Sequence, residues 1–341
     1  MAGIEVRQHD ALGMLVDDVG VVVIGRNEGE RLRRCLESVV APGRHVVYVD
    51  SGSTDDSVAM AQSKGVDIVA LDMRIPVTAA RARNAGFARL QALAPQCHLV
   101  QFVDGDCELI DGWLTAAHRF LDERNDVACV CGRLQERFPE RSIYNRLCDL
   151  EWDRPPGETD ACGGIALMRS EVFSSVGGFN QDLVAGEEPE LCARLRGQGW
   201  KVWRLPGRMA WHDANMLRFG QWWKRSTRVG YAFAQSAWLR RSSGERPYLK
   251  ARLRAWVWAA VLPASIAVAC LAWGPGALLL ALAYPFQVAR IARAGKGPWG
   301  IRIARGVFLV LGRFAELRGQ WQFWRSHRLG RASSTSFDYK S

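Results

Sequence analysis

The residues of this sequence best suited to chemistry are two aspartates, Asp104 and Asp106, with Gly105 between them. They follow residues 100–103, a mostly apolar and β-prone run that is too short for a helix and predicts a buried strand. Gly105 allows a tight turn, so both carboxylates would lie where this strand leaves its sheet. Such carboxylates suit Mg²⁺ or Mn²⁺, which are typically bound by one or two carboxylates, water and substrate phosphates. An ordinary solvated turn is the alternative interpretation.

A second pair of carboxylates, Glu187 and Glu188, stands directly before Pro189. Proline suits the first turn of a helix, and the spacing of the apolar residues predicts a helix that runs to Gly197. The helix dipole stabilises an ionised carboxylate at this place by a few tenths to about 1 kcal/mol. Such a carboxylate can accept the proton of a sugar hydroxyl as a general base. Simple charge complementarity at the helix start is the alternative.

Two further side chains could belong to the same site. His212 follows a predicted strand at residues 201–205 and could be another metal ligand, although a lone histidine is more often structural. Arg83 lies near the start of a predicted helix, where a basic group would face phosphate or lie on a solvated face. The predicted helix over residues 219–231 mixes aromatic residues with arginines, which suits either packing or a lid over a pyrophosphate.

The elements that must position these residues alternate between strand and helix. Strands are predicted at residues 19–25, 46–49, 66–71, 100–103, 127–132, 162–168 and 201–205, and helices around 32–39, 57–64, 81–86, 112–124 and 187–197. Either Ser53 or Thr54 is expected to cap the second of these helices. Short connections between such elements favour a doubly wound parallel sheet, in which ligands bind outside the carboxyl ends of the strands. Asp50 and Asp104 would therefore lie on the same edge.

Composition and charge separate the chain into two halves. Its 341 residues are 48% hydrophobic and 23% charged, as in a globular protein. Residues 1–200 hold 21 Lys and Arg against 31 Asp and Glu, whereas residues 201–341 hold 24 against 4. This split favours an acidic catalytic half and a basic half on anionic lipid. Nine cysteines without metal-finger spacing are expected to be reduced. The N-terminal residues carry acids and no long apolar run, so no signal peptide is expected.

The basic half contains two apolar runs. Residues 255–273 are free of charge and close to the length of a bilayer span, and residues 277–289 form a shorter run after a Gly-Pro-Gly turn. Basic residues flank the pair on both sides, so a helical hairpin over about 255–291 would place them at the cytoplasmic side. A re-entrant or interfacial hairpin and a buried soluble hairpin are the alternatives.

A long basic helix is predicted after the hairpin. Residues 301–331 carry seven arginines and one glutamate, interleaved with apolar and aromatic residues, which is the pattern of an amphipathic helix in a membrane interface. The tail after Ala332 is expected to be loosely ordered. The predicted domains are residues 1–235, with the catalytic groups, and residues 236–341, associated with the membrane.

Five stretches of residues 19–235 together resemble family 2 glycosyltransferases of the GT-A fold. They are residues 23–28 (Val-Ile-Gly-Arg-Asn-Glu), 49–55 (Val-Asp-Ser-Gly-Ser-Thr-Asp), 82–84 (Ala-Arg-Asn), 103–106 (Val-Asp-Gly-Asp) and 177–179 (Gly-Gly-Phe) leading to 186–191 (Gly-Glu-Glu-Pro-Glu-Leu). Each is a weak signal alone, but their order along the chain is specific. The resemblance implies an α/β, Rossmann-like mixed and mainly parallel sheet with helices on both faces, followed by the C-terminal helices.

The resemblance also implies a nucleotide-diphosphate-sugar donor, a divalent metal on the D-x-D motif, and direct displacement with inversion at the anomeric carbon. By position Asp50 would contact the nucleobase, and Arg26 and Glu28 would line its pocket. Asp106 would hold the metal, and Asp104 would face the ribose or sugar and stand near the metal. The motifs place Ser51 and Arg83 among the donor-binding residues.

One position departs from the family pattern. Family members usually have Glu-Asp, with the aspartate as base, where this chain has Glu187-Glu188. Glu188 is one methylene longer, so both glutamates are candidates for the base. The C-terminal half is similar to that of bacterial members that act on lipid-linked acceptors in surface polysaccharide assembly. This similarity implies a UDP- or GDP-sugar donor, a lipid-linked or glycan acceptor, and a place on the cytoplasmic face of the inner membrane.

Other functions make different demands on the sequence. A nucleotidyltransferase would carry a glycine- and arginine-rich phosphate loop after its first strand, but residues 25–30 contain two acids and no lysine. A non-catalytic protein that binds the donor would have no need for the carboxylates. A nucleic-acid binder is disfavoured, because the basic half is also the membrane-like half.

Overall fold

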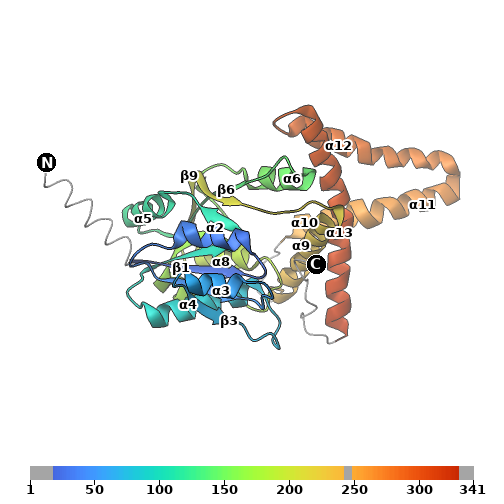
Figure 1. Cartoon of the computed structure of the whole chain (residues 1–341). Coiled ribbons are helices and arrows are strands. Elements are labelled where there is room, and N and C mark those ends of the chain that lie inside the picture. The colour runs from blue at the N-terminus through green and yellow to red at the C-terminus, as the bar shows by residue number, and fades with distance from the viewer. Residues whose placement is uncertain (1–17, 242–247, 330–341) are drawn as a thin grey trace. The chain divides into compact units, whose positions relative to one another are not determined.

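The computed structural model of the protein describes residues 18–241 and 248–329, and the chain divides into two compact units. The first unit runs to Arg141 and adds Cys148–Asp182 and Glu187–Asn215; the second holds Ser142–Leu147, Leu183–Gly186 and the chain from Met216 on. Figure 1 shows the elements in chain order. The expectation of no signal peptide and that of a loosely ordered tail after Ala332 concern residues outside those described. The predicted domain boundary at residue 235 falls inside a helix of the second unit and stays a prediction.

The first unit is built on one mixed sheet. Its strands are β1 Val19–Gly25, β2 Val46–Asp50, β3 Asp67–Ala70, β4 Leu99–Asp104, β5 Cys107–Leu109, β6 Val127–Glu136, β7 Gly157–Glu158, β8 Ala166–Arg169 and β9 Lys201–His212. Its helices are α2 Glu30–Val39, α3 Ser57–Ser63, α4 Ala79–Leu93, α5 Trp113–Glu123, α7 Ser170–Ser175 and α8 Glu187–Gly197, while α6 Ile143–Trp152 is shared between the units.

The strand order is β3-β2-β1-β4-β8-β6-β9-β5, with β7 paired to β9. The strands β3, β2, β1 and β4 are parallel, whereas β8 runs antiparallel to both of its neighbours, β4 and β6. Parallel strands need crossover connections, and helices supply them in this half. The predicted mixed sheet with a parallel core is confirmed.

Helices cover both faces of the parallel core, with α2 on one side of the sheet and α4 on the other (Figure 1). The strands β1 and β2 are almost wholly apolar and buried, as strands covered on both faces must be. Helix α4 lies very close to these strands at Gly86, where even a methyl group would lie only 2.8 Å from a Val49 methyl carbon. Glycine at this position therefore allows the close packing. The carboxyl ends of β1, β2 and β4 are thereby held in a rigid frame.

Three local predictions differ from the structure. The last strand extends well beyond residue 205 to His212, because β9 continues through Pro206 and Gly207 with shifts of register against β6. His212 is therefore the last residue of a strand and does not follow one. The strand predicted from residue 162 begins only at Ala166, after Gly163 in the left-handed region. Asp56, not Ser53 or Thr54, precedes α3 as its N-cap residue.

All nine cysteines lie in the described part of the chain, and none of them forms a disulfide there. Eight of them are buried. Burial raises the pKa of the Cys129 thiol to about 11 and that of Cys131 to about 12. Neutral buried thiols act as small apolar groups.

The second unit consists of helices within the described residues. They are α9 Phe219–Leu239, α10 Leu249–Trp256, a π-helical turn Val257–Val261, α11 Leu262–Trp273, a 3₁₀ segment Pro275–Leu282, α12 Ala283–Ala294 and α13 Trp299–Arg328. The long helix α13 packs on α9 and on α12. Its buried face is rich in small residues, including Gly312, Ala315 and Gly319. The position of this helix in a membrane interface stays a prediction. Its glycine face packs against α9.

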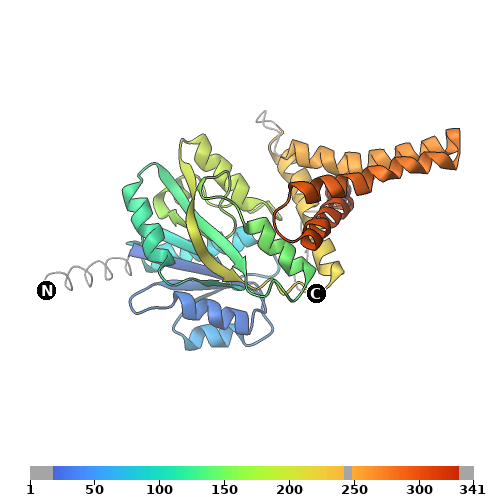
Figure 2. The same cartoon turned by 90° about the horizontal axis from the view of Figure 1, so that it is seen from above.

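Two helical arms of this unit are long and apolar enough to cross a membrane, Leu249–Trp273 and Pro275–Ala294. Gly274, in the left-handed region, joins them into a hairpin, and Figure 2 shows them running alongside one another. Only 11% and 6% of their apolar windows are buried within the protein. A core hairpin of a soluble protein would be mostly buried, so that alternative is disfavoured.

A hydrogen bond between the arms compensates for a proline. Pro263 has no N–H, and a proline ring crowds the preceding helical turn. That turn is widened to a π-helix, in which the Leu262 N–H bonds the Val257 carbonyl. In this register the carbonyl that Pro263 leaves without a donor is that of Trp258. The Tyr284 hydroxyl of the other arm donates to this carbonyl at 2.8 Å.

Candidate active site

The carboxyl ends of three parallel strands bring the predicted residues to one edge of the sheet. The register pairs Gly25 of β1 with Asp50 of β2, and Ile24 of β1 with Asp104 of β4. Asp50 and Asp104 therefore end neighbouring strands on either side of β1, as the sequence predicted. Gly105 turns the chain directly after β4, and its backbone N–H donates to the Ile24 carbonyl at 2.8 Å.

Asp50 organises the loop that follows β2. Its buried carboxylate accepts hydrogen bonds from the backbone N–H groups of Gly52 and Ser53, at 3.0 and 2.9 Å, and from the Tyr48 hydroxyl at 3.1 Å. Ser51 is also buried, and its N–H donates to the Gly25 carbonyl. Asp50 thus orders the loop after β2, and the Ser51 backbone joins that loop to the end of β1.

The loop after β1 carries two more of the predicted donor-binding residues. Arg26 is half-buried, whereas Glu28 is buried and forms an ion pair with Arg31 at 2.8 Å. Asn27, in the left-handed region, accepts a hydrogen bond from the Thr54 N–H at 2.7 Å. The loop is therefore anchored both to the loop after β2 and to the first turn of α2.

Arg83 is the central cation of the site. Its guanidinium is almost fully buried and bridges two carboxylates, Asp104 at 2.7 Å and Glu187 at 2.7 Å. A buried guanidinium requires such compensation, and the two ion pairs tie α4 to the end of β4 and to the start of α8. A side chain at Gly164 would collide with the Arg83 guanidinium, so this glycine lets the chain pass close to the bridge. The sequence did not distinguish this arrangement from a solvated arginine.

The two glutamates at the start of α8 differ in their surroundings. Glu187 is buried in the ion pair with Arg83, while Glu188 lies outside that pair and is half-buried. Burial and the neighbouring charge of Glu187 raise the pKa of the Glu188 carboxyl to about 7. A carboxyl with this pKa can accept a proton near neutral pH, which is what a general base must do.

Asp106 and His212 form a second cluster at the same edge. Asp106 Oδ1 and His212 Nε2 are 3.8 Å apart, and Cys107 joins them in a group whose potential ligand atoms lie within 4.8 Å of one another. Two donors that each bind one ion at about 2.1 Å can be separated in this way. A carboxylate oxygen is a ligand that Mn²⁺ and Mg²⁺ prefer, and a neutral imidazole nitrogen is a common ligand of divalent metals. The two residues therefore fit a divalent metal.

Cys107 contributes differently to this cluster. Burial, with the nearby charge of Asp106, raises the pKa of its thiol well above the usual range. The neutral thiol donates to Asp106 Oδ1 at 3.5 Å. Cys107 therefore orients the carboxylate, and Asp106 and His212 remain the candidate ligands. Asp104, the third predicted metal residue, has one oxygen bound by Arg83.

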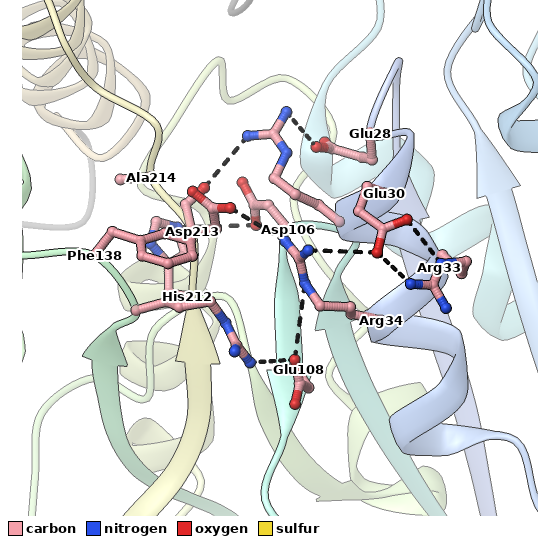
Figure 3. Close-up of polar contacts among 12 residues, drawn as sticks. Glu28, Glu30, Arg33, Arg34, Asp106, Glu108, Phe138, His212, Asp213 and Ala214 are labelled. Atoms are coloured by element: carbon pink, nitrogen blue, oxygen red, sulfur yellow. Dashed lines mark hydrogen bonds and ion pairs between the residues drawn. The ribbon is translucent and has the colours of Figure 1, made fainter. Parts of the chain in front are cut away.

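A network of charged residues around this cluster was not predicted from the sequence. Figure 3 shows Glu108, Asp213 and Arg34 close to Asp106 and His212. Arg34 of α2 forms an ion pair with Asp213 at 3.3 Å, and Arg31 donates to the Asp213 carbonyl at 3.3 Å. In the sequence, the spacing of Arg31 and Arg34 on one side of α2 is what a solvated helix face would also show.

Part of this chain is similar in sequence to known proteins. Residues 20–177 match the family described as "Glycosyl transferase family 2". A pre-mycofactocin glycosyltransferase of Mycobacterium tuberculosis is 29% identical over 213 residues, which cover 58% of this chain and 43% of that protein. A TPR repeat-containing protein of Synechococcus elongatus is 31% identical over 146 residues, covering 42% of this chain and 34% of that protein. The chain thus spans less than half the length of these relatives.

A solved structure extends the likeness to nearly the whole chain. The mannosyltransferase PcManGT from Pyrobaculum calidifontis, in complex with GDP-Man and Mn²⁺, covers 94% of this chain and 88% of its own, with a TM-score of 0.52 and 19% sequence identity. At that identity the likeness concerns the fold. The fold is of the GT-A type, which confirms the fold class predicted from the sequence.

Proposed function

We propose that this chain, which belongs to glycosyl transferase family 2 through residues 20–177, transfers a sugar from a nucleotide-diphosphate-sugar to an acceptor hydroxyl with inversion at the anomeric carbon. The observation that carries the proposal is that the carboxylates at one edge of the sheet have different partners. Arg83 binds Asp104 and Glu187, which leaves Glu188 outside the ion pairs as a candidate base. The Asp106–His212 pair lies at the same edge.

The donor would bind across the loops after β1 and β2. The Asp50 carboxylate accepts three hydrogen bonds that hold the loop after β2 in place, so this side of the donor site is formed by contacts within the protein. Arg26 and Glu28 would line the nucleobase pocket, with Ser51 at its floor. The donor class we propose is a UDP- or GDP-sugar; PcManGT, which shares the fold, was determined with GDP-Man.

Asp106 and His212 would hold a Mg²⁺ or Mn²⁺ ion, with Asp104 next to them. When bound there, such an ion neutralises the diphosphate that leaves. The Arg83 ion pair keeps one Asp104 oxygen turned inward, so its other oxygen is available toward the ribose or the sugar.

Glu188 would act on the acceptor. Its carboxylate accepts the proton of the acceptor hydroxyl, while that oxygen forms a bond to the anomeric carbon. The bond from the anomeric carbon to the diphosphate oxygen breaks on the opposite face, and attack in line inverts the centre. Glu187, bound to Arg83, holds the start of α8 in place for this step.

The second unit supports a membrane-bound acceptor. Both arms of the hairpin expose apolar side chains, and the exposed fraction reaches 89% at Leu271. Residues 255–289 contain no charge, and basic residues stand at both ends of this stretch. We therefore propose a lipid-linked or glycan acceptor, as in bacterial surface polysaccharide or glycolipid synthesis, and anchorage in membrane lipids. The cytoplasmic face of the inner membrane is the proposed location.

Release of nucleoside diphosphate tests the proposed reaction. The detergent-solubilised full chain is incubated with a panel of UDP- and GDP-sugars and bacterial lipid extract, with Mn²⁺ or with EDTA. We expect one donor to be turned over with Mn²⁺ and not with EDTA. Glu188→Gln should lower the rate by about 10²–10⁴-fold, because it removes the base and keeps the shape.

Two results would overturn the proposal. The first is wild-type turnover by both Glu188→Gln and Asp106→Asn, since neither the base nor the metal ligand would then be needed. The second is the absence of Mn²⁺-dependent binding of both UDP and GDP, measured by calorimetry, since this would exclude the donor itself. Nucleotide binding without turnover, with all acceptors supplied, would indicate a non-catalytic protein.

A further inference from the structure

Glu136 at the end of β6 is a fully buried carboxylate that the proposed reaction does not yet use. The β6–β9 register places it opposite His212. Taking a carboxylate out of water costs several kcal/mol unless hydrogen bonds compensate for it, so a buried glutamate at this place needs an explanation.

The contacts of Glu136 converge on the segment that carries His212. Its Oε2 atom lies 3.0 Å from His212 Nδ1. Both of its oxygens also accept from the Ala214 N–H, at 3.2 and 3.3 Å. A carboxylate only accepts, so Nδ1 carries a proton, and Nε2 is the ring nitrogen that can bind a metal ion.

The Nε2 atom of His212 lies near Asp106. His212 Nε2 is 3.8 Å from Asp106 Oδ1, which is too far for a hydrogen bond. The ring cannot turn easily, because Trp152 packs edge-on against it with ring centroids 4.4 Å apart. Rotation would also break the bond to Glu136.

The next residue is held from the opposite side. Asp213 is bound by Arg34 and, through its carbonyl, by Arg31, both on α2 (Figure 3). Arg31 also pairs with Glu28 in the proposed donor pocket. The segment from His212 to Ala214 is therefore held between α2 on one side and Glu136 on the other.

We propose that Glu136 is a positioning residue that holds His212 in the Nδ1–H form with Nε2 directed at the metal. The inference rests on the proposed function, since it concerns the ligand of the metal that this function needs. Partners of ligating histidines in other proteins increase metal affinity by 10–100-fold, because they orient the ring and raise its basicity. Glu136 would do the same here without touching substrate or metal.

The test measures Mn²⁺ affinity and the state of the His212 ring in the full chain. We expect Glu136→Gln to lower the affinity for Mn²⁺ about 10–100-fold, by titration calorimetry in the presence of GDP or UDP. Nitrogen-15 NMR of the imidazole at pH 8, without metal, should show the Nδ1–H form in the wild type and a mixture of both forms in the variant. This second readout does not depend on catalysis.

Two variants serve as controls. His212→Ala should abolish the tight Mn²⁺ binding. Asp149→Asn alters a buried carboxylate that accepts from the backbone N–H of Glu136, so it perturbs the same strand while leaving the Glu136 carboxylate in place. It should bind Mn²⁺ as the wild type does. Thermal unfolding checks that Glu136→Gln is folded, and Glu136→Asp, which keeps the charge but shortens the reach, should lie between wild type and Glu136→Gln.

The outcomes separate the two proposals. If His212→Ala loses Mn²⁺ and Glu136→Gln binds it as the wild type does, the role of Glu136 is wrong and the metal site stands. If His212→Ala binds Mn²⁺ like the wild type, His212 is not a ligand. The proposed metal site and the proposed role of Glu136 are then both wrong. Equal losses in Asp149→Asn and Glu136→Gln would show a general effect on the strand and would overturn the positioning role.

Discussion

Glu188 is the residue whose ionisation should control the pH dependence of the reaction. Its folded-state pKa is about 7, raised from its ordinary value first by burial and then by the charge of Glu187. Only the ionised form accepts a proton, so kcat/KM should rise with pH and level off above about 7. Below that value it should fall tenfold per pH unit. The measurement is a profile of kcat/KM between pH 5 and 9 at saturating Mn²⁺.

Glu187→Gln provides the matched variant for this profile. It removes the neighbouring negative charge that raises the Glu188 pKa, and it frees Arg83 to interact with Glu188. Both effects favour the ionised carboxylate, so the limb should move to lower pH. A profile that keeps its midpoint in this variant would show that another group is titrating.

The sequence predicted the types of these residues better than their partners. Asp104, Asp106, Glu187 and Glu188 could be placed from local pattern, since each stands at the end of a strand or the start of a helix. The pairing of Arg83 with Asp104 and Glu187 depends on three elements far apart in the chain. Glu136 gave no signal, because the predicted strand ended at residue 132 and a lone acid beyond it is indistinguishable from a solvated one, whereas β6 continues to Glu136.

Among the elements, the crossing of α9 and α13 depends on two glycines. A methyl group at Gly319 would lie 2.6 Å from the Tyr231 N and would collide with the Thr227 carbonyl. Gly230 of α9 meets the backbone of Glu316 in the same way. Side chains at these positions would force the helix backbones apart.

Gly319→Ala should therefore destabilise the second unit by about 1–3 kcal/mol, although alanine is the better helix former. The control is Gly300→Ala on the same helix, where a methyl group meets nothing within 4 Å. That change should be neutral or stabilise by up to about 1 kcal/mol. Thermal unfolding of both variants in detergent measures the difference. Equal unfolding temperatures would show that the crossing tolerates separation.

The sequence pattern predicted the type of an element correctly where the whole element lies in one environment, such as a strand that is buried along its length. The continuous apolar run of β1 was predicted with its correct bounds, Val19–Gly25. In contrast, β9 continues through Pro206 and Gly207, two residues that normally end a strand, because shifts of register against β6 absorb them. The interaction of the α13 glycines with α9 could not be predicted either, since arginine and aromatic residues dominate the sequence of that helix.

At the scale of the whole molecule, the chain joins an acidic N-terminal half to a strongly basic C-terminal half that contains the hairpin. Basic residues outside the apolar arms would strengthen attachment to anionic lipid, by about 1 kcal/mol each near the surface. This contribution is screened by salt, whereas burial of apolar arms is not. Membranes that contain the protein should thus retain it in 1 M NaCl and in alkaline carbonate if the hairpin is inserted.

A single charge within one arm distinguishes insertion from surface attachment. Val268 is exposed on α11 and lies inside the first apolar arm, and an arginine in the middle of a bilayer-spanning helix costs about 2.5–3.5 kcal/mol. Leu253 is similarly exposed on α10 but stands between Arg252 and Arg254, outside the charge-free residues 255–289. Val268→Arg should increase the fraction extracted by carbonate, whereas Leu253→Arg should not. If the protein were attached only at the membrane surface, an added positive charge would not weaken its attachment. Both variants would then stay on the membrane as well as the wild type does at low salt, and 1 M NaCl would release all three. That result would contradict insertion of the hairpin.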